Sequence, residues 1–153
     1  MPIAVSLRHL ALSQAVGSAI AGQTGCQTMN RLLLVNDVKH LADRTAVMLE
    51  GMGWEVYIAS EDRFVFEFCV ARRPSLLITD IEMSGCQGFE SVTTARSLFP
   101  DLFIVAVTRG RHEEIWPKVA EFCGANRYIV GPVSSAQLSE VINGGIEEGL
   151  LQA

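Results

Sequence analysis

The stretch Leu76–Gly88 reads Leu-Leu-Ile-Thr-Asp-Ile-Glu-Met-Ser-Gly-Cys-Gln-Gly, and it decides the fold of the chain. Three apolar residues lead directly to Thr79 and Asp80, and turn residues follow between Ser84 and Gly88. A short apolar run bounded by turn residues is typical of a strand buried on both faces, as in a parallel sheet. Open α/β sheets place their chemistry at the carboxyl ends of such strands. The stretch therefore predicts a carboxylate, that of Asp80, at a strand tip beside a loop.

The composition is that of one globular domain. The chain has 153 residues, 49% of them hydrophobic and 19% charged, and its net charge is −5. This length gives a single domain with a sizeable core, and the acidic balance argues against nucleic-acid binding. The four cysteines form no CxxC pair and no metal-ligand spacing with the three histidines. We therefore expect reduced thiols in a cytoplasmic protein.

Residues 1–28 differ from the rest of the chain, because they contain no acid and only Arg8 among Lys and Arg. Their apolar stretch, Leu10–Ala21, is too short and too polar to span a membrane. Met29 immediately precedes the first predicted strand. Three interpretations are open: a disordered or loosely helical extension, a chain that starts at Met29, or an export signal. We expect the extension, with the folded domain covering residues 29–153.

From Arg31 onward, strand-like and helix-like segments alternate five times. The predicted strands are Leu32–Val35, Trp54–Ala59 as an outer strand, Ser75–Asp80, Leu102–Val107 and Arg127–Val130. The predicted helices are Val38–Met52, Glu61–Arg73, Phe89–Phe99, a fourth that ends at Cys123, and a last one from Ser134 to about Leu150. Because Pro117 is tolerated only in a first helical turn, the fourth helix should begin near Trp116 rather than at His112. Five βα units predict a flavodoxin-like, doubly wound parallel α/β sheet with strand order 2-1-3-4-5.

Four strand ends should converge at one edge of this sheet. They carry Asn36 and Asp37, Asp80, Thr108, and the pair Gly131-Pro132. Two acids with nearby oxygen donors form the kind of site that Mg²⁺ favours. Asp80 can then attack phosphorus and become an acyl phosphate, while the Thr108 hydroxyl donates to a phosphoryl oxygen. The alternative is that Asp37 and Thr108 only cap the helices that follow them.

These residues resemble response-regulator receiver domains over roughly Arg31–Gly149. The family's acceptor segment reads apolar strand, Asp, x, x, Met, Pro, Gly, x, x, Gly. In this chain Asp80 takes the acceptor position, and Ser84 stands where Pro is usual. The family's acidic pair falls on residues 36–37, and its switch hydroxyl falls on Thr108.

The family's Gly-Ala-x-x-Tyr-x-x-Lys-Pro signature has a counterpart in residues 124–132, which read Gly-Ala-Asn-Arg-Tyr-Ile-Val-Gly-Pro. Tyr128 falls on the aromatic switch position. Pro132 keeps its place, and the resemblance implies a cis peptide bond before it. The resemblance also implies a Mg²⁺ site formed by Asp37, Asp80, the backbone carbonyl of Glu82 and, through a water, Asn36.

Two departures from the family remove charge. Asn36 replaces one acid, so Mg²⁺ should be held weakly, and Gly131 replaces the signature lysine. A charge-assisted hydrogen bond contributes about 1.5–3 kcal/mol, so phosphorylation or its transmission should weaken by roughly ten- to a hundredfold. Arg109 follows the switch hydroxyl, where the family has a small residue. It either supplies the missing positive charge or is an exposed loop arginine.

The resemblance implies a stand-alone response regulator of two-component signal transduction or a phosphorelay. A histidine kinase or phosphotransfer protein would phosphorylate Asp80. The face formed by the fourth helix, the fifth strand and the last helix would then bind a downstream protein or a second copy. We expect no nucleic-acid or membrane partner, and no turnover beyond self-phosphotransfer and autodephosphorylation.

Two other functions are open to different degrees. A degenerate receiver that binds partners without phosphorylation is favoured by Asn36 and Gly131. A flavin carrier on the same fold is disfavoured, because residues 36–39 are not the Ser/Thr/Gly-rich loop that would bind its phosphate.

Overall fold

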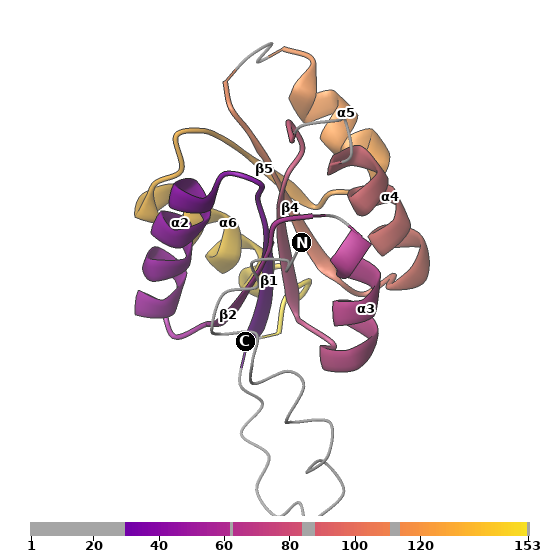
Figure 1. Cartoon of the computed structure of the whole chain (residues 1–153), viewed down its shortest axis with the longest axis horizontal. Coiled ribbons are helices and arrows are strands. Elements are labelled where there is room, and N and C mark those ends of the chain that lie inside the picture. Colours follow the sequence, from indigo (N-terminus) through magenta and orange to yellow (C-terminus); the bar gives the residue numbers. More distant parts are fainter. Residues whose placement is uncertain (1–29, 62, 84–87, 111–113, 153) are drawn as a thin grey trace, which may run out of the picture.

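The computed structural model describes residues 30–61, 63–83, 88–110 and 114–152. Figure 1 shows the arrangement of its helices and strands. The predictions for residues 1–28 and for the loop around Ser84 lie outside the described residues, as do Cys26, Cys86 and His112. No helix in the described part of the chain is both long and apolar enough to cross a membrane.

Five parallel strands form one sheet in the order β2-β1-β3-β4-β5, which confirms the predicted topology. The strands are β1 (Arg31–Val35), β2 (Glu55–Ala59), β3 (Leu76–Asp80), β4 (Phe103–Thr108) and β5 (Arg127–Val130). The segment predicted as an outer strand is β2, at one edge of the sheet. The central strand β3 is buried at every residue, as the apolar run before Asp80 predicts.

Helices cover both faces of the sheet (Figure 1). They are α2 (Lys39–Gly51), α3 (Arg63–Arg72), α4 (Gly88–Leu98), α5 (Trp116–Cys123) and α6 (Ser135–Glu147). Along β1, Leu32 and Leu34 pack with α2 and α6, whereas Leu33 and Val35 pack with α3, α4 and α5. This alternation places two apolar layers against one sheet and makes the central strands apolar on both sides.

Proline, capping side chains and a left-handed glycine determine where these helices begin and end. Helix α5 begins at Trp116 with Pro117 in its first turn, as predicted. Ser134 and Gln137 form a capping box at the start of α6. This helix ends at Glu147 rather than near Leu150, because Gly149 has a φ of 72° and turns the chain away. Similarly, α3 ends at Arg72, one residue before the predicted end.

Candidate functional site

The parallel register brings the predicted site residues to one edge of the sheet. Asp80 ends β3 beside Val107 of β4, and Thr108 ends β4 beside Val130 of β5. Asp37 lies two residues beyond the end of β1, the other neighbour of β3. The carboxylates of Asp37 and Asp80, the Thr108 hydroxyl and the Gly131 backbone thus share the carboxyl edge.

The guanidinium of Arg109 bridges the two carboxylates. Its Nε lies 2.9 Å from Oδ2 of Asp80, and its Nη2 lies 2.9 Å from Oδ1 of Asp37. The side chain of Asp80 is 2% exposed, that of Asp37 23% and that of Arg109 36%. The planar fork of arginine allows one side chain to contact both acids. Of the two interpretations of Arg109, the structure therefore favours the one in which it supplies charge to the site.

Glu82 fixes both Asp80 and Arg109. Its backbone N–H donates to Oδ1 of Asp80 at 2.8 Å, and its carboxylate accepts the backbone N–H of Arg109. Both oxygens of Asp80 therefore have a donor within the chain. From the sequence, Glu82 was expected to contribute only its backbone carbonyl, so these two contacts were missed. The sequence feature that could have indicated them is an acid two residues after the Asp that ends a strand.

Burial and hydrogen bonding act in opposite directions on the pKa of Asp80. Burial raises this pKa above the ordinary aspartate value, and the Glu82 N–H and the Arg109 guanidinium lower it, but burial prevails. For Arg109, burial lowers the pKa, yet the hydrogen bond and charge of Asp80 and those of Asp37 outweigh it and raise the pKa. The arginine is therefore a permanent cation in this site.

The arrangement of these side chains suits a guanidinium better than a divalent cation. Carboxylate oxygens are suitable Mg²⁺ ligands, but Arg109 already bonds to one oxygen of each acid. The amide oxygen of Asn36 accepts the N–H of Val38 at 2.8 Å. Among the described residues, no group of three or more His, Cys, Asp and Glu side chains is placed to hold a metal ion. A divalent cation between Asp37 and Asp80 would have to displace Arg109.

The alternative role of Asp37 and Thr108 as simple helix caps does not describe this edge. The residue that caps α2 is Val38, which makes no side-chain capping bond. The Thr108 hydroxyl is buried and has no hydrogen-bond partner within the described part of the chain. A buried hydroxyl without a partner is costly, and it is available to a group that enters the site.

Gly131 packs directly against the end of β4. Its N–H donates to the Thr108 carbonyl at 2.7 Å, and a Cβ added to Gly131 would lie 2.9 Å from that same oxygen. The signature lysine of the family therefore cannot be placed here without a backbone shift. The peptide bond between Gly131 and Pro132 is cis, as the resemblance implies.

Tyr128 lies outside the group of site residues. It pairs with Ala106, two residues before Thr108, and is 49% exposed. The aromatic position of the signature therefore points to solvent in this structure. Its predicted role as a switch remains a prediction.

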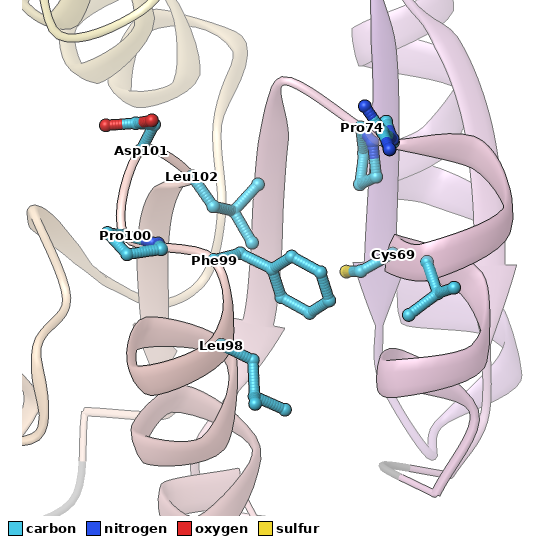
Figure 2. A pocket seen from close by; sticks show the side chains of 9 residues that line it. Cys69, Pro74, Leu98, Phe99, Pro100, Asp101 and Leu102 are labelled. Carbon is cyan, nitrogen blue, oxygen red and sulfur yellow. The ribbon is translucent and has the colours of Figure 1, made fainter.

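A hollow lies at the opposite edge of the sheet, between α3 and the end of α4 (Figure 2). Its volume is about 430 Å³. Its lining is largely apolar, with Arg73 and Asp101 as the charged members: Cys69, Val70, Arg73, Pro74, Leu98, Phe99, Pro100, Asp101 and Leu102. Burial raises the pKa of the Cys69 thiol to about 11, so this group is protonated and unreactive near neutrality. The hollow lies apart from Asp37 and Asp80, and its thiol is unreactive.

The strand order and the acidic strand-end residues define a doubly wound α/β domain with a site at its carboxyl edge. Residues 32–143 match the response regulator receiver domain, and the chain belongs to this family. Members of this family generally bind Mg²⁺ at the phosphorylation site and interact with histidine kinases or phosphotransfer proteins and with downstream targets.

Solved receiver structures superpose on the chain. A CheY-like receiver domain protein from Methanospirillum hungatei is 28% identical, with a TM-score of 0.71, over 79% of this chain and 96% of that one. The receiver domain of NtrX from Brucella abortus is 24% identical, with a TM-score of 0.69, over 76% and 98% of the two chains, and supports the fold alone.

A curated relative is much longer than this chain. It is the uncharacterized transcriptional regulatory protein YesN of Bacillus subtilis, 28% identical over 117 residues. The match covers 72% of this chain but 30% of that protein, so it corresponds to one part of YesN.

Proposed function

We propose that this receiver domain accepts a phosphoryl group on Asp80 from a histidine kinase or phosphotransfer protein and transmits the change through protein contacts. The observation that carries the proposal is the 2.9 Å contact between Arg109 and the acceptor carboxylate. A receiver needs a cation at its acceptor, because negative charge accumulates there as the phosphoryl group arrives. Gly131 provides no such cation, and Arg109 supports the proposal by supplying one from the position after β4.

The residues around Asp80 have distinct roles in this proposal. An oxygen of Asp80 attacks phosphorus, and the Glu82 N–H holds the other oxygen in place. Arg109 compensates for the charge of the acceptor and of the incoming phosphoryl oxygens. The unpartnered Thr108 hydroxyl donates to one of those oxygens. The proposal also includes a weak Mg²⁺ site on Asp37, Asp80, the Glu82 carbonyl and Asn36. This site can form only if Arg109 leaves the carboxylate of Asp37 or that of Asp80.

The partner face is proposed from exposed apolar side chains on α5, on β5 and at Ile115, the residue that precedes α5. Phe122 is 91% exposed, Ile115 58% and Tyr128 49%. Isolated exposed apolar residues are common, but three on adjoining elements favour a protein-binding face. A downstream protein or a second copy of the chain would bind there, in the cytoplasm, as expected from the sequence.

A phosphorylation-independent binding module is the second candidate. The observation that favours it is the closed arrangement of the site, in which Arg109 already satisfies both carboxylates. In this alternative Asp80 and Arg109 form a structural ion pair, and the partner face has one fixed conformation.

Intact-mass spectrometry separates the two candidates. The full chain is incubated with acetyl phosphate and Mg²⁺, and we expect a mass gain of one phosphoryl group that hydroxylamine removes. Asp80→Asn should not gain this mass, whereas Asp43→Asn, an exposed acid on α2, should gain it like the unchanged chain. An unchanged mass for the wild-type chain would favour the binding module.

A further inference from the structure

We propose that Arg109 is the built-in counter-ion of the acceptor site, so that phosphoryl transfer to Asp80 proceeds without a divalent cation. This inference rests on the proposed function and specifies its ionic requirement. It starts from a disagreement: the family generally uses Mg²⁺, but in this chain a guanidinium lies between the carboxylates that would hold it.

Hydrogen bonds hold both the backbone and the guanidinium of Arg109 in place. Its backbone N–H is bonded to the Glu82 carboxylate, and its guanidinium donates to Asp80 and Asp37 from two different nitrogens. Three acids from two segments, Asp37 after β1 and Asp80 and Glu82 at the end of β3, therefore orient one arginine. This distinguishes it from an exposed arginine with one adventitious ion pair.

The charge of the site is already compensated without metal. Asp80 is almost fully buried, and an isolated carboxylate in that position would be strongly disfavoured. Arg109 supplies the positive charge from within the chain. Because the guanidinium does not lose its proton in proteins, this compensation persists at any ordinary pH.

The transfer step balances with these groups alone. With acetyl phosphate as donor, an oxygen of the Asp80 carboxylate attacks phosphorus and forms a new P–O bond. The P–O bond to the acetyl group breaks, and acetate leaves with the bonding electron pair. Arg109 can release Asp37 and donate that nitrogen to a phosphoryl oxygen, while the Thr108 hydroxyl donates to another.

Arg109 and Mg²⁺ should also compete for the same oxygens. A cation that bridges Asp37 and Asp80 must first break at least one of two charge-assisted hydrogen bonds. Removal of the guanidinium takes one hydrogen-bond donor and one positive charge away from each carboxylate. We therefore expect Arg109→Ala to bind Mg²⁺ at least about tenfold more tightly than the wild-type chain, by calorimetry.

The test compares labelling in EDTA and in Mg²⁺. The full wild-type chain should be phosphorylated by acetyl phosphate at rates within about twofold in the two conditions, whereas Arg109→Ala should lose roughly ten- to a hundredfold in EDTA and recover with Mg²⁺. Arg44→Ala removes an exposed arginine of α2 and should behave like the wild-type chain. Thermal melts of all chains verify folding.

The outcomes keep the two proposals apart. Wild-type labelling that requires Mg²⁺ would overturn the counter-ion inference and leave phosphorylation of Asp80 intact. Absence of labelling in both conditions would overturn both. The wild-type comparison needs no substitution, so it decides the question even if Arg109→Ala does not fold.

Discussion

Nε of Arg109 lies 2.9 Å from Oδ2 of Asp80, although the two residues are 29 positions apart in the chain. The contact joins the end of β4 to the end of β3, its neighbour in the sheet. It opposes the effect of burial, which raises the pKa of Asp80 above the ordinary value. The protonation of Asp80 therefore depends on an arginine that follows the neighbouring strand.

The first prediction concerns the titration of Asp80. Arg109→Ala should raise the pKa of Asp80 further, because it removes a hydrogen bond and a positive charge that favour the carboxylate. The measurement is a pH titration of the aspartate carboxyl carbon by ¹³C NMR. Arg44→Ala is the control, since its side chain is on the exposed surface of α2. An unchanged Asp80 titration in Arg109→Ala would contradict the observed ion pair.

The raised pKa also fixes the sign of two pH dependences. A carboxyl group whose pKa is raised by folding contributes most to stability in acid, and this contribution is lost as the pH rises through the pKa of the folded state. Labelling requires the carboxylate, so it should fall as the pH is lowered through that same pKa. Asp80→Asn should remove this component from the pH dependence of unfolding, measured in urea.

The sheet could be predicted from the sequence, whereas the contacts of its site could not. Apolar runs and helical periods depend on local residues, so the strand order and the edge that carries Asp80 were predictable. Whether Arg109 supplies charge to the site or is an exposed loop arginine depended on where Asp37 lies, 72 residues away, and on how Glu82 holds the Arg109 backbone. A long side chain has many rotamers, and only tertiary placement of its partners selects one.

The tertiary contacts of glycines also could not be predicted from the sequence. In the sequence, Gly144 and Gly145 are adjacent glycines of the last helix, and the spacing from Leu138 and Ile142 places Gly145 on the apolar face. In the structure, a Cβ on Gly144 meets nothing within 4 Å, whereas one on Gly145 would lie 2.6 Å from the Phe103 ring. Periodicity predicts which face of a helix is buried but not how closely it approaches the sheet.

This difference gives a matched pair of stability predictions. Gly144→Ala should stabilise the domain by about 0.4–1 kcal/mol, because alanine reduces the entropy of the unfolded chain. Gly145→Ala should destabilise it by about 1–3 kcal/mol, because Phe103 is 1% exposed and its ring cannot move aside. The measurement is urea unfolding of both variants. Equal effects would show that α6 does not pack on Phe103 in this way.

Another stability prediction concerns Arg73, which follows α3 with a φ of 47°. A left-handed conformation costs a residue with a Cβ about 1–2 kcal/mol, and glycine is the usual residue at this place after a helix. Arg73→Gly should therefore stabilise the domain by about 1 kcal/mol in urea unfolding. Arg73→Ala removes the same side chain but keeps the Cβ, so it should give no gain. Equal gains for both would assign the effect to the side chain rather than to the backbone.

The last prediction concerns Gly131, where the sequence departs most from its family. A Cβ at this position would lie 2.9 Å from the Thr108 carbonyl oxygen, so Gly131→Ala should cost about 1–3 kcal/mol of stability. It should leave phosphorylation unchanged, because Arg109 keeps its contacts. Gly131→Lys carries the same steric cost and adds a cation where the family has one.

The two substitutions can therefore separate charge from packing. In an Arg109→Ala background, Gly131→Lys should restore most of the labelling lost in EDTA, roughly ten- to a hundredfold, because its ammonium can replace the guanidinium beside Asp80. Gly131→Ala in the same background should restore none. If both double variants label equally, the position after β5 does not reach the acceptor, and its charge does not substitute for Arg109. If the lysine variant alone recovers, the end of β4 and the end of β5 are two places from which this fold can supply one required cation.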